Sequence, residues 1–287
     1  LCPALRDTPL WLYFHENQFA HPIGERQWAS HQQGWQFQSI QNALCADRID
    51  FNTAFNRDSF FAGARRLLKK FPERLPGAPL QRLAKNSGVL SVPLTGRFAA
   101  FRDAPKNRRL IVWNHRWEWD KQPEHFLRAL TALAQEGVDF ELAMLGSGGG
   151  RKAGEFDKYR QLLGSRIRHW GEADEATYAA FIREAGIGVS CALHDFQGLA
   201  MLELAQAGAT VVVPERVAYP ECLPTAHFYQ GSAIDAAADI DALKDALREV
   251  LANPEATQLP PHHLPCWQAL KGRYLDQINR LAGMALT

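Results

Sequence analysis

The sequence predicts an α/β protein with two domains, each built on a parallel sheet that helices cover on both faces. Its 287 residues suit about two domains of ordinary size. Short apolar runs alternate along the chain with segments of helical period, as they do in βαβ units. Runs such as LIVW at 110–113 and TVVV at 210–213 are apolar throughout, which is typical of strands buried on both faces.

The individual elements follow from this alternation. Strands are predicted at residues 10–14, 48–52, 89–92, 110–113, 140–145, 167–170, 187–191 and 210–213. Helices are predicted at residues 38–46, 57–70, 123–135, 175–184, 199–207 and 242–251. A stretch rich in Pro, Gly and charge at 93–108 predicts a first domain over 1–105 and a second over 106–265. An amphipathic helix over 266–287 is able to cross back to the first domain.

The composition excludes several classes of protein. With 46% hydrophobic and 22% charged residues, the chain is neither disordered nor collagen-like nor a coiled coil. No apolar run approaches the ~20 residues of a membrane-spanning helix. The five cysteines are widely spaced and form no CxxC pair or zinc-site pattern, which indicates reduced thiols in a cytoplasmic protein and predicts no metal site.

The first 105 residues are basic, with 13 Lys and Arg against 8 Asp and Glu, whereas the remainder is acidic. The basic residues gather at Arg65, Arg66, Lys69 and Lys70, with Arg57, Arg74, Arg82 and Lys85 nearby in the sequence. Such a face attracts a polyanion, including tRNA, because binding releases counterions. The alternative is a solvated helix face.

Ligands of parallel α/β sheets bind at the carboxyl ends of the strands, so polar residues that follow strands are the candidates for a site. Arg116 and Lys121 follow the strand at 110–113 and precede the helix at 123–135. An Arg fork and a Lys charge beside a helix N-terminus favour a diphosphate. Two ordinary surface cations are the alternative interpretation.

A second group of candidates follows the strand at 187–191, namely Asp195, Gly198, Leu199 and Glu203. The amides of Gly198 and Leu199 open a helix and can face an anion. Glu203 lies in an otherwise apolar run, where an ordinary surface Glu is unusual, and can accept hydrogen bonds from ribose hydroxyls. A capping Asp195 and a solvated Glu203 are the alternative.

Two further loops follow strands. The glycine-rich turn at 145–150, which contains Gly146, admits close approach of a ligand but fits neither a dinucleotide fingerprint nor a Walker loop. His15, Glu16, Asn17 and Gln18 follow the first strand and suggest the polar wall of a pocket. Four other histidines lack such a position after a strand and are interpreted as structural or surface residues: His21, His31, His262 and His263.

These motifs resemble those of a retaining glycosyltransferase of the GT-B fold and of family 4. Arg116 and Lys121 match the Gly-Arg-x4-Lys segment that follows the first strand of that family's second domain. The residues from Asp195 to Glu203 match its E-x7-E element, with Asp195 in place of the usual first Glu. An additional residue, Gln197, stands between the Phe and the Gly of the element.

A closer resemblance covers most of the chain. The following segments are similar to the tRNA-queuosine mannosyltransferase family: YFHENQ (13–18), FNTAFNRDSF (51–60), WNHRWEWDKQPE (113–124), HWG (169–171), HDFQGLAMLE (194–203) and YPE (219–221). The resemblance implies two Rossmann-like domains that face a cleft. It also implies retaining transfer of mannose from GDP-mannose to the cyclopentenediol of queuosine in tRNA, without a metal or another cofactor.

The resemblance implies roles for the candidate residues. The donor would be bound by Arg116, Lys121, Gly146, His194, Phe196, Gly198, Leu199 and Glu203. The catalytic group would consist of Arg116, Lys121, His15 and Asp195. The acceptor side would comprise His15, Glu16, Asn17 and Gln18, and the basic residues Arg65, Arg66, Lys69 and Lys70 would bind tRNA.

Other functions stay open at this point. The chain begins with Leu1, and about 105 residues are short for the first domain of such an enzyme, so that domain is expected to be incomplete. A GT-B glycosyltransferase with a lipid or saccharide acceptor would share the donor site. An epimerase or phosphorylase of the same fold and a non-catalytic RNA-binding module with a vestigial sugar site are the remaining alternatives.

Overall fold

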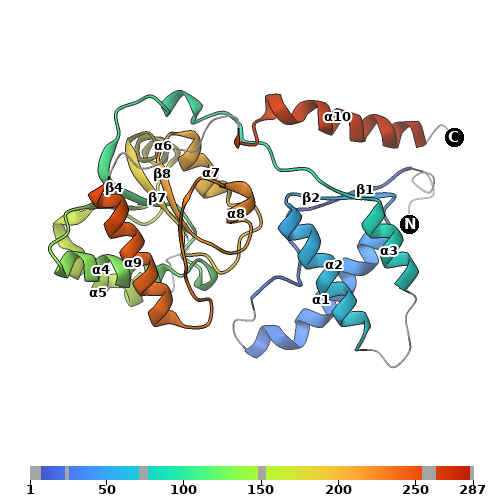
Figure 1. The fold of residues 1–287 in the computed structure, drawn as a ribbon, viewed down its shortest axis with the longest axis horizontal. Helices are drawn as coiled ribbons and strands as arrows, with labels where there is room; N and C mark the ends of the chain where they lie inside the picture. The colour runs from blue at the N-terminus through green and yellow to red at the C-terminus, as the bar shows by residue number, and fades with distance from the viewer. Residues whose placement is uncertain (1–7, 23–25, 71–76, 148–152, 254–262, 285–287) are drawn as a thin grey trace. The chain divides into compact units, whose positions relative to one another are not determined.

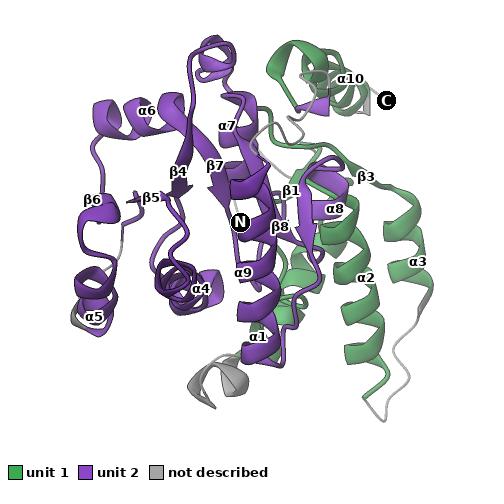
Figure 2. Ribbon diagram, turned by 60° about the vertical axis from the view of Figure 1, so that its left-hand side comes forward, with its two compact units in different colours: residues 1–93, 265–287 green, residues 94–264 purple. Residues whose placement is uncertain are grey.

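The computed structural model describes residues 8–22, 26–70, 77–147, 153–253 and 263–284. The chain divides into two compact units, which Figure 2 colours separately: unit 1 is residues 1–93 with 265–287, and unit 2 is residues 94–264. All the strand pairs in both units are parallel among the described residues. The parallel sheets predicted from the alternating pattern are therefore confirmed.

Unit 1 contains a three-stranded sheet with the order β1-β2-β3. Its strands are β1 (Trp11–Phe14), β2 (Arg48–Phe51) and β3 (Ser87–Val89). Its helices are α1 (Arg26–Leu44), α2 (Ala54–Leu68), α3 (Gly77–Lys85) and α10 (Trp267–Met284) (Figure 1).

The two faces of the unit 1 sheet pack against different helices. Leu12 and Phe14 of β1 join a core that includes buried residues of α1, α2 and α3, where the rings of Phe14 and Phe51 stack with their centroids 5.0 Å apart. Trp11 and Tyr13 alternate with these residues, and the ring centroid of Trp11 lies 6.2 Å from that of Tyr274 in α10. The C-terminal helix therefore packs on the second face, although it is far from β1 in the sequence.

That second face carries a buried ion pair. Asp50 is 1% exposed and accepts hydrogen bonds from Arg48 at 2.7 Å and from the indole of Trp11 at 2.9 Å. Gly88 lies opposite Asp50 in the register, and a Cβ at that position would collide with both partners of the pair. The ion pair thus requires a glycine on the neighbouring strand.

Unit 2 contains a six-stranded sheet with the order β6-β5-β4-β7-β8-β9. Its strands are β4 (Asn107–Trp113), β5 (Glu141–Met144), β6 (Ile167–Trp170), β7 (Ala185–Val189), β8 (Thr210–Pro214) and β9 (His227–Tyr229). Its α-helices are α4 (Pro123–Gln135), α5 (Ala153–Leu163), α6 (Glu175–Glu184), α7 (Leu199–Gln206), α8 (Tyr219–Cys222) and α9 (Ala236–Ala252). Short 3-10 helices are η2 (Ala99–Phe101), η3 (Trp119–Lys121) and η4 (Gly164–Arg166).

Both faces of this sheet are covered, as the apolar strands predict. Ile111 and Trp113 of β4 belong to a core shared with α4, α5 and α9. Leu110 and Val112 of the same strand belong to a second core shared with α6 and α7. No helix among the described residues is long and apolar enough to span a membrane.

The sequence predictions differ from the structure in identifiable places. The helices at 123–135 and 175–184 and the strand at 167–170 are confirmed at the predicted bounds. The strand predicted at 89–92 has the wrong bounds: β3 is Ser87–Val89, because its register with β2 ends at Phe51, whose carbonyl oxygen accepts a last hydrogen bond from the Leu90 amide. Among the α-helices and strands, sequence reasoning missed α3, α5, α8 and β9, together with the N-terminal parts of α1 and α9.

Replacing Asp50 with Ala is expected to lower the free energy of unfolding by about 3 kcal/mol, near the low end for breaking a buried pair, because Arg48 is itself partly exposed. The measurement is urea unfolding followed by circular dichroism. Asp58→Ala is the control, because its pair with Arg57 is exposed and should contribute less than about 1 kcal/mol. Equal losses in the two variants would contradict the structural role given to the buried pair.

Candidate functional site

The loops that follow β4 and β7 meet at the carboxyl ends of these neighbouring strands. The ammonium group of Lys121, in η3, donates a hydrogen bond to the carbonyl oxygen of His194. The amide of Leu193 donates to the carbonyl oxygen of Asp120 at 2.8 Å. The structure therefore brings together Lys121 and His194, two residues that the sequence assigns to the same site from separate motifs.

Asp120 is the charged centre of this junction. Its carboxylate lies 3.2 Å from the Lys121 ammonium and 3.7 Å from the imidazole of His194. Burial alone would raise the pKa of Asp120, but the His194 ring and the Lys121 charge outweigh burial and lower that pKa to about 2. Asp120 is thus ionised at neutral pH and holds both loops.

Arg116 differs from Lys121 in its surroundings. Its side chain is 64% exposed and pairs with Glu118 at 3.0 Å. Nearby, Gly146 follows β5, and a Cβ there would collide with the carbonyl oxygen of His115, so only glycine fits this approach of two loops. Residues 148–150 of the predicted glycine-rich turn lie outside the described residues.

The Asp195 carboxylate organises the loop before α7. It accepts hydrogen bonds from the amide of Gly198 at 2.7 Å and from the hydroxyl of Tyr219 at 3.0 Å. The Gly198 amide thus has a carboxylate partner within the loop, as the alternative of a capping Asp195 predicts. Gly198 has a φ of 73°, and a Cβ there would lie 2.8 Å from the Tyr219 ring, so both conformation and space require glycine.

Glu203 lies on α7 beside the end of β4. Its carboxylate accepts a hydrogen bond from Tyr178 at 2.6 Å, and the Tyr178 hydroxyl accepts one from Asn114 at 2.8 Å. Burial raises the pKa of Glu203 above its ordinary value, although the Tyr178 hydrogen bond opposes the shift. This arrangement excludes the alternative of a fully solvated Glu203.

The buried polar atoms near the end of β4 that have no hydrogen-bond partner among the described residues include Asn114 Oδ1 and His115 Nε2. Burial lowers the pKa of His115 to about 4, so this ring is neutral at neutral pH. Buried polar groups are normally satisfied, so such atoms beside a cluster of site residues indicate a place where a ligand could bond.

Sequence reasoning missed the residues that support the loop after β7. Arg216 donates hydrogen bonds to the carbonyl oxygens of Cys191 and Ala192, at 2.8 and 3.0 Å, and pairs with the buried Asp239 at 2.7 Å. Tyr219 is fully buried and bonds Ser190 at 2.6 Å as well as Asp195. The only sequence signal for these residues was Tyr219 in the YPE motif.

In unit 1, the four polar residues after β1 have different surroundings. Asn17 is 2% exposed, and its amide nitrogen bonds Asn56 and Ser59 while its oxygen accepts from the Phe19 amide. Asn17 therefore fixes the loop and does not form a polar pocket wall, which corrects the prediction. His15 is exposed, with its ring against Tyr13, and only Glu16 and Gln18 of the four line a pocket of ≈ 430 Å³.

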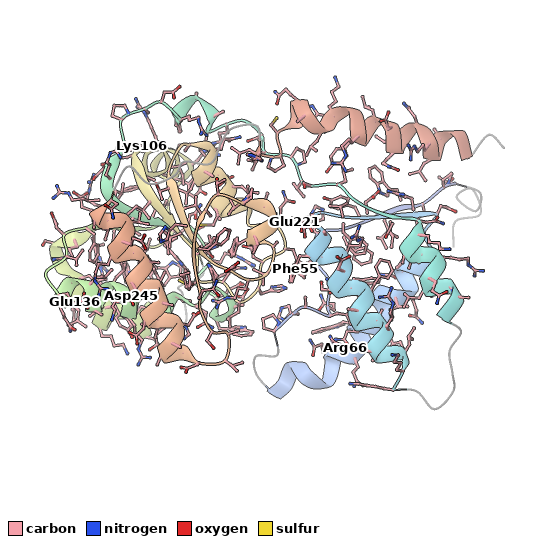
Figure 3. The ribbon with its side chains drawn as sticks, viewed as in Figure 1. Phe55, Arg66, Lys106, Glu136, Glu221 and Asp245 are labelled. Carbon is pink, nitrogen blue, oxygen red and sulfur yellow. The ribbon has the colours of Figure 1, made fainter. Side chains whose placement is uncertain are left out.

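The predicted basic face lies at the C-terminal ends of two helices. Arg65, Arg66, Lys69 and Lys70 are all exposed at the end of α2, where Figure 3 labels Arg66. Arg82 and Lys85 are exposed at the end of α3. Arg57 pairs with Asp58, and Arg74 lies outside the described residues.

The described residues contain no group of three or more His, Cys, Asp or Glu side chains placed to hold a metal ion. The groups of the unit 2 site that can attract an anion include the cations Arg116 and Lys121 and, as neutral hydrogen-bond donors, the amides at the start of α7. This set can bind an anion such as a diphosphate, and Glu203 can accept hydrogen bonds from hydroxyl groups.

Solved structures define the class of fold. Sucrose-phosphate synthase from Thermosynechococcus elongatus is similar over 95% of this chain and 68% of its own, with a TM-score of 0.67 and 14% identity. The α,α-trehalose 6-phosphate synthase from Burkholderia multivorans is similar over 96% of this chain and 63% of its own, with a TM-score of 0.61 and 14% identity. The fold is the GT-B fold of glycosyltransferases, as the motifs implied.

The chain belongs to the family of glycosyl transferases group 1, whose family model matches residues 97–259. Residues 1–94 match the model of the tRNA-queuosine alpha-mannosyltransferase N-terminal region. The tRNA-queuosine alpha-mannosyltransferase of Drosophila melanogaster is 30% identical over 242 residues, which are 81% of this chain and 64% of that protein. These matches confirm the resemblance, and the chain spans less than two thirds of that relative's length.

The junction at Asp120 predicts a pH dependence of stability. An Asp whose pKa is about 2 when folded and ~3.9 when unfolded stabilises the protein above pH ~4, and this contribution disappears as the pH falls towards 2. Urea unfolding between pH 5 and pH 2 should show a smaller loss of stability for Asp120→Asn than for the parent chain. The exposed Asp103→Asn serves as the control and should keep the parent's slope. If the stability of Asp120→Asn fell with pH as steeply as that of the parent chain, the lowered pKa of Asp120 would be contradicted.

Proposed function

We propose that the chain transfers mannose from GDP-mannose to queuosine in tRNA, with retention of configuration at the sugar. The observation that carries this proposal is the pair of family matches, one to the queuosine-enzyme N-terminal model over 1–94 and one to the group 1 model over 97–259. The Drosophila relative, named for the same sugar and acceptor, supports it. Guanine as the donor base comes from the resemblance of the motifs.

The donor diphosphate is bound by Arg116, Lys121 and the first-turn amides of α7 from Leu199 onward. Such amides have no partner within their own helix and carry the positive end of its dipole. The pair between Arg116 and Glu118 is exposed and weak, so the guanidinium can exchange Glu118 for a phosphate. These groups offset the negative charge that gathers on the leaving phosphate and do so without a metal ion.

The sugar and ribose of the donor contact the loop and helix after β7. Glu203, held by Tyr178, accepts hydrogen bonds from the ribose hydroxyls. His194 and Phe196 line the sugar position, where their rings lie edge to face with centroids 4.8 Å apart. Asp195 uses the acceptor capacity left by its protein hydrogen bonds for a sugar hydroxyl. Asn114 and His115 contribute their unsatisfied buried atoms.

The tRNA is bound by unit 1. Phosphates contact the basic face at Arg65, Arg66, Lys69 and Lys70, and the acceptor nucleoside lies near His15, Glu16 and Gln18. A basic, exposed face supports tRNA over a neutral saccharide acceptor, because phosphate neutralisation dominates the affinity of proteins for nucleic acids.

Arg116→Ala is expected to lower the rate of mannose transfer roughly a hundredfold, because one donor of charge to the leaving phosphate is lost. Transfer is measured by mass spectrometry of queuosine-containing tRNA after incubation with GDP-mannose, and donor binding is measured by calorimetry. Arg109→Ala is the matched control, since Arg109 is an exposed arginine on β4 that pairs with Asp139.

The outcomes of this experiment separate the alternatives. If Arg116→Ala transfers mannose at the full rate, the proposed role of Arg116 in the donor site is contradicted. Donor binding with transfer only to a lipid or saccharide contradicts the tRNA acceptor. Binding of tRNA by a parent chain that binds no GDP-mannose contradicts a glycosyltransferase and leaves the RNA-binding module.

Replacing Arg65, Arg66, Lys69 and Lys70 with Ala is expected to weaken tRNA binding and to flatten its dependence on salt. Each lost phosphate contact reduces the slope of log affinity against log salt concentration by about 0.7–0.9. Filter binding across a salt series gives the slope. Alanine replacement of Lys158 and Arg160, which are exposed on α5, is the control. An unchanged slope in the fourfold variant would show that this face is only solvated.

A further inference from the structure

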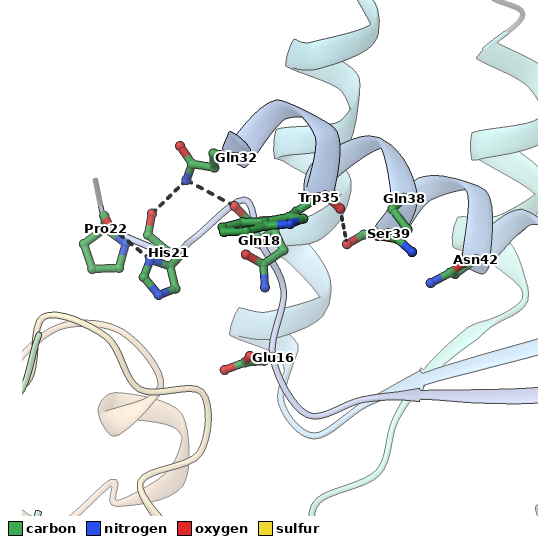
Figure 4. Close-up of a pocket in the computed structure, with 9 residues that line it drawn as sticks. All are labelled: Glu16, Gln18, His21, Pro22, Gln32, Trp35, Gln38, Ser39 and Asn42. Atoms are coloured by element: carbon green, nitrogen blue, oxygen red, sulfur yellow. Dashed lines mark hydrogen bonds between the residues drawn. The ribbon is translucent and has the colours of Figure 1, made fainter. Parts of the chain in front are cut away.

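A pocket of ≈ 430 Å³ lies between the chain that follows β1 and one face of α1 (Figure 4). Its volume falls in the ordinary range for small-ligand pockets. The described residues that line it are Glu16, Gln18, His21, Pro22, Gln32, Trp35, Gln38, Ser39 and Asn42. The pocket is at the carboxyl end of β1, where parallel α/β sheets bind ligands.

The wall on α1 follows helical spacing. Gln32, Trp35, Ser39 and Asn42 recur at intervals of three and four residues and therefore share one side of the helix. The helix itself is anchored, because Ile40 and Ala43 are buried in the core of unit 1. The wall is thus carried by a helix that the core holds in place.

The facing wall is tied to the helix by hydrogen bonds from side-chain amides of α1 to a backbone carbonyl oxygen. The Gln36 amide donates to the carbonyl oxygen of Gln18 at 3.2 Å, and the Gln32 amide donates to the same oxygen at 3.4 Å. The side-chain amides of Gln18, Gln38 and Asn42 also line the pocket, and each offers a hydrogen-bond donor and an acceptor.

We propose that this pocket holds one unpaired nucleobase of an RNA loop, stacked on Trp35 and hydrogen-bonded along its edge by the amides of Gln18, Gln38 and Asn42. Trp35 is 38% exposed, and Figure 4 shows its ring above Gln18 with Gln38 and Asn42 further along the helix. Specific recognition of single-stranded RNA combines aromatic stacking with hydrogen bonds to base edges, and side-chain amides supply both a donor and an acceptor for such an edge.

The charge of the pocket selects a base over a phosphate. No Lys or Arg is among its described lining residues, and Glu16 is the one acidic side chain there. A phosphate would therefore meet a carboxylate without a compensating cation, whereas a base can donate an N–H group to that carboxylate. The cations that could hold the RNA backbone are elsewhere in unit 1, on α2 and α3.

The inference rests on the proposed function for the identity of the RNA, a tRNA anticodon loop, and its test is independent of sugar transfer. Stem-loop RNAs with the anticodon-loop sequence, each with an abasic residue at a different loop position, are bound to the 287-residue chain at constant salt. Loss of one stacked base corresponds to about 5- to 140-fold in affinity. We expect Trp35→Ala to lose affinity within this range on intact RNA, Trp35→Phe to retain most of it, and Gln38→Ala to lose less.

The decisive result is the coupling between protein and RNA. Trp35→Ala should not change the affinity for the one abasic RNA that lacks the stacked base. For the other abasic RNAs it should lower the affinity as much as for intact RNA. Gln41→Ala is the control, because Gln41 is an exposed amide of α1 outside the pocket. Unchanged binding by Trp35→Ala, or an equal loss on every abasic RNA, overturns the proposal. Base-dependent binding without any mannose transfer supports the pocket and contradicts only the proposed function.

Discussion

The candidate donor site depends on the junction that Lys121, Asp120 and the His194 carbonyl oxygen form between two loops. The loop after β4 carries Arg116 and Lys121, the loop after β7 carries His194, Phe196 and Gly198, and the two groups are more than seventy residues apart in the sequence. Because Asp120 and Lys121 are both largely buried, loss of either charge would leave the other uncompensated in a poorly solvated place. The same interaction therefore gives the site its geometry and makes it sensitive to single substitutions.

A second set of contacts fixes the loop after β7 from the side of β8. Arg216 holds the carbonyl oxygens of Cys191 and Ala192, and Tyr219 holds Ser190 and Asp195. Asp195 in turn holds the Gly198 amide, so the first turn of α7 is oriented by a chain of buried hydrogen bonds that begins in another loop. Sites supported in this way need little reorganisation when a ligand binds. Asp195 contributes to this rigidity whether or not it also touches a sugar.

The fold was largely predictable, and the reasons for the exceptions are local. Buried strands such as β4 are apolar without interruption, so their prediction needs no tertiary information. The first half of α1 reads QWASHQQGWQ, where glutamines and a glycine hide the helical period, and α3 has a proline at Pro79. The roles of Asn17 and Gly198 were not predictable, because they depend on Asn56 and Asp195 at exact distances. In the sequence, the polar residues of α1 that line the unit 1 pocket look like those of any solvated helix face. Only the structure shows that the chain after β1 lies opposite them.

Arg116 and Lys121 are paired in the motif, but the structure gives them different physical roles. Lys121 is 13% exposed and already committed to the His194 carbonyl oxygen, so its charge is available to a ligand at a fixed position. Arg116 is 64% exposed and its partner Glu118 is also at the surface, so little free energy opposes its exchange of that carboxylate for a phosphate. A bidentate Arg–phosphate contact is stronger than an exposed ion pair. In the proposed donor site, one preplaced charge thus combines with one that is recruited when the diphosphate binds, and Arg116 is the residue whose geometry should change most on binding.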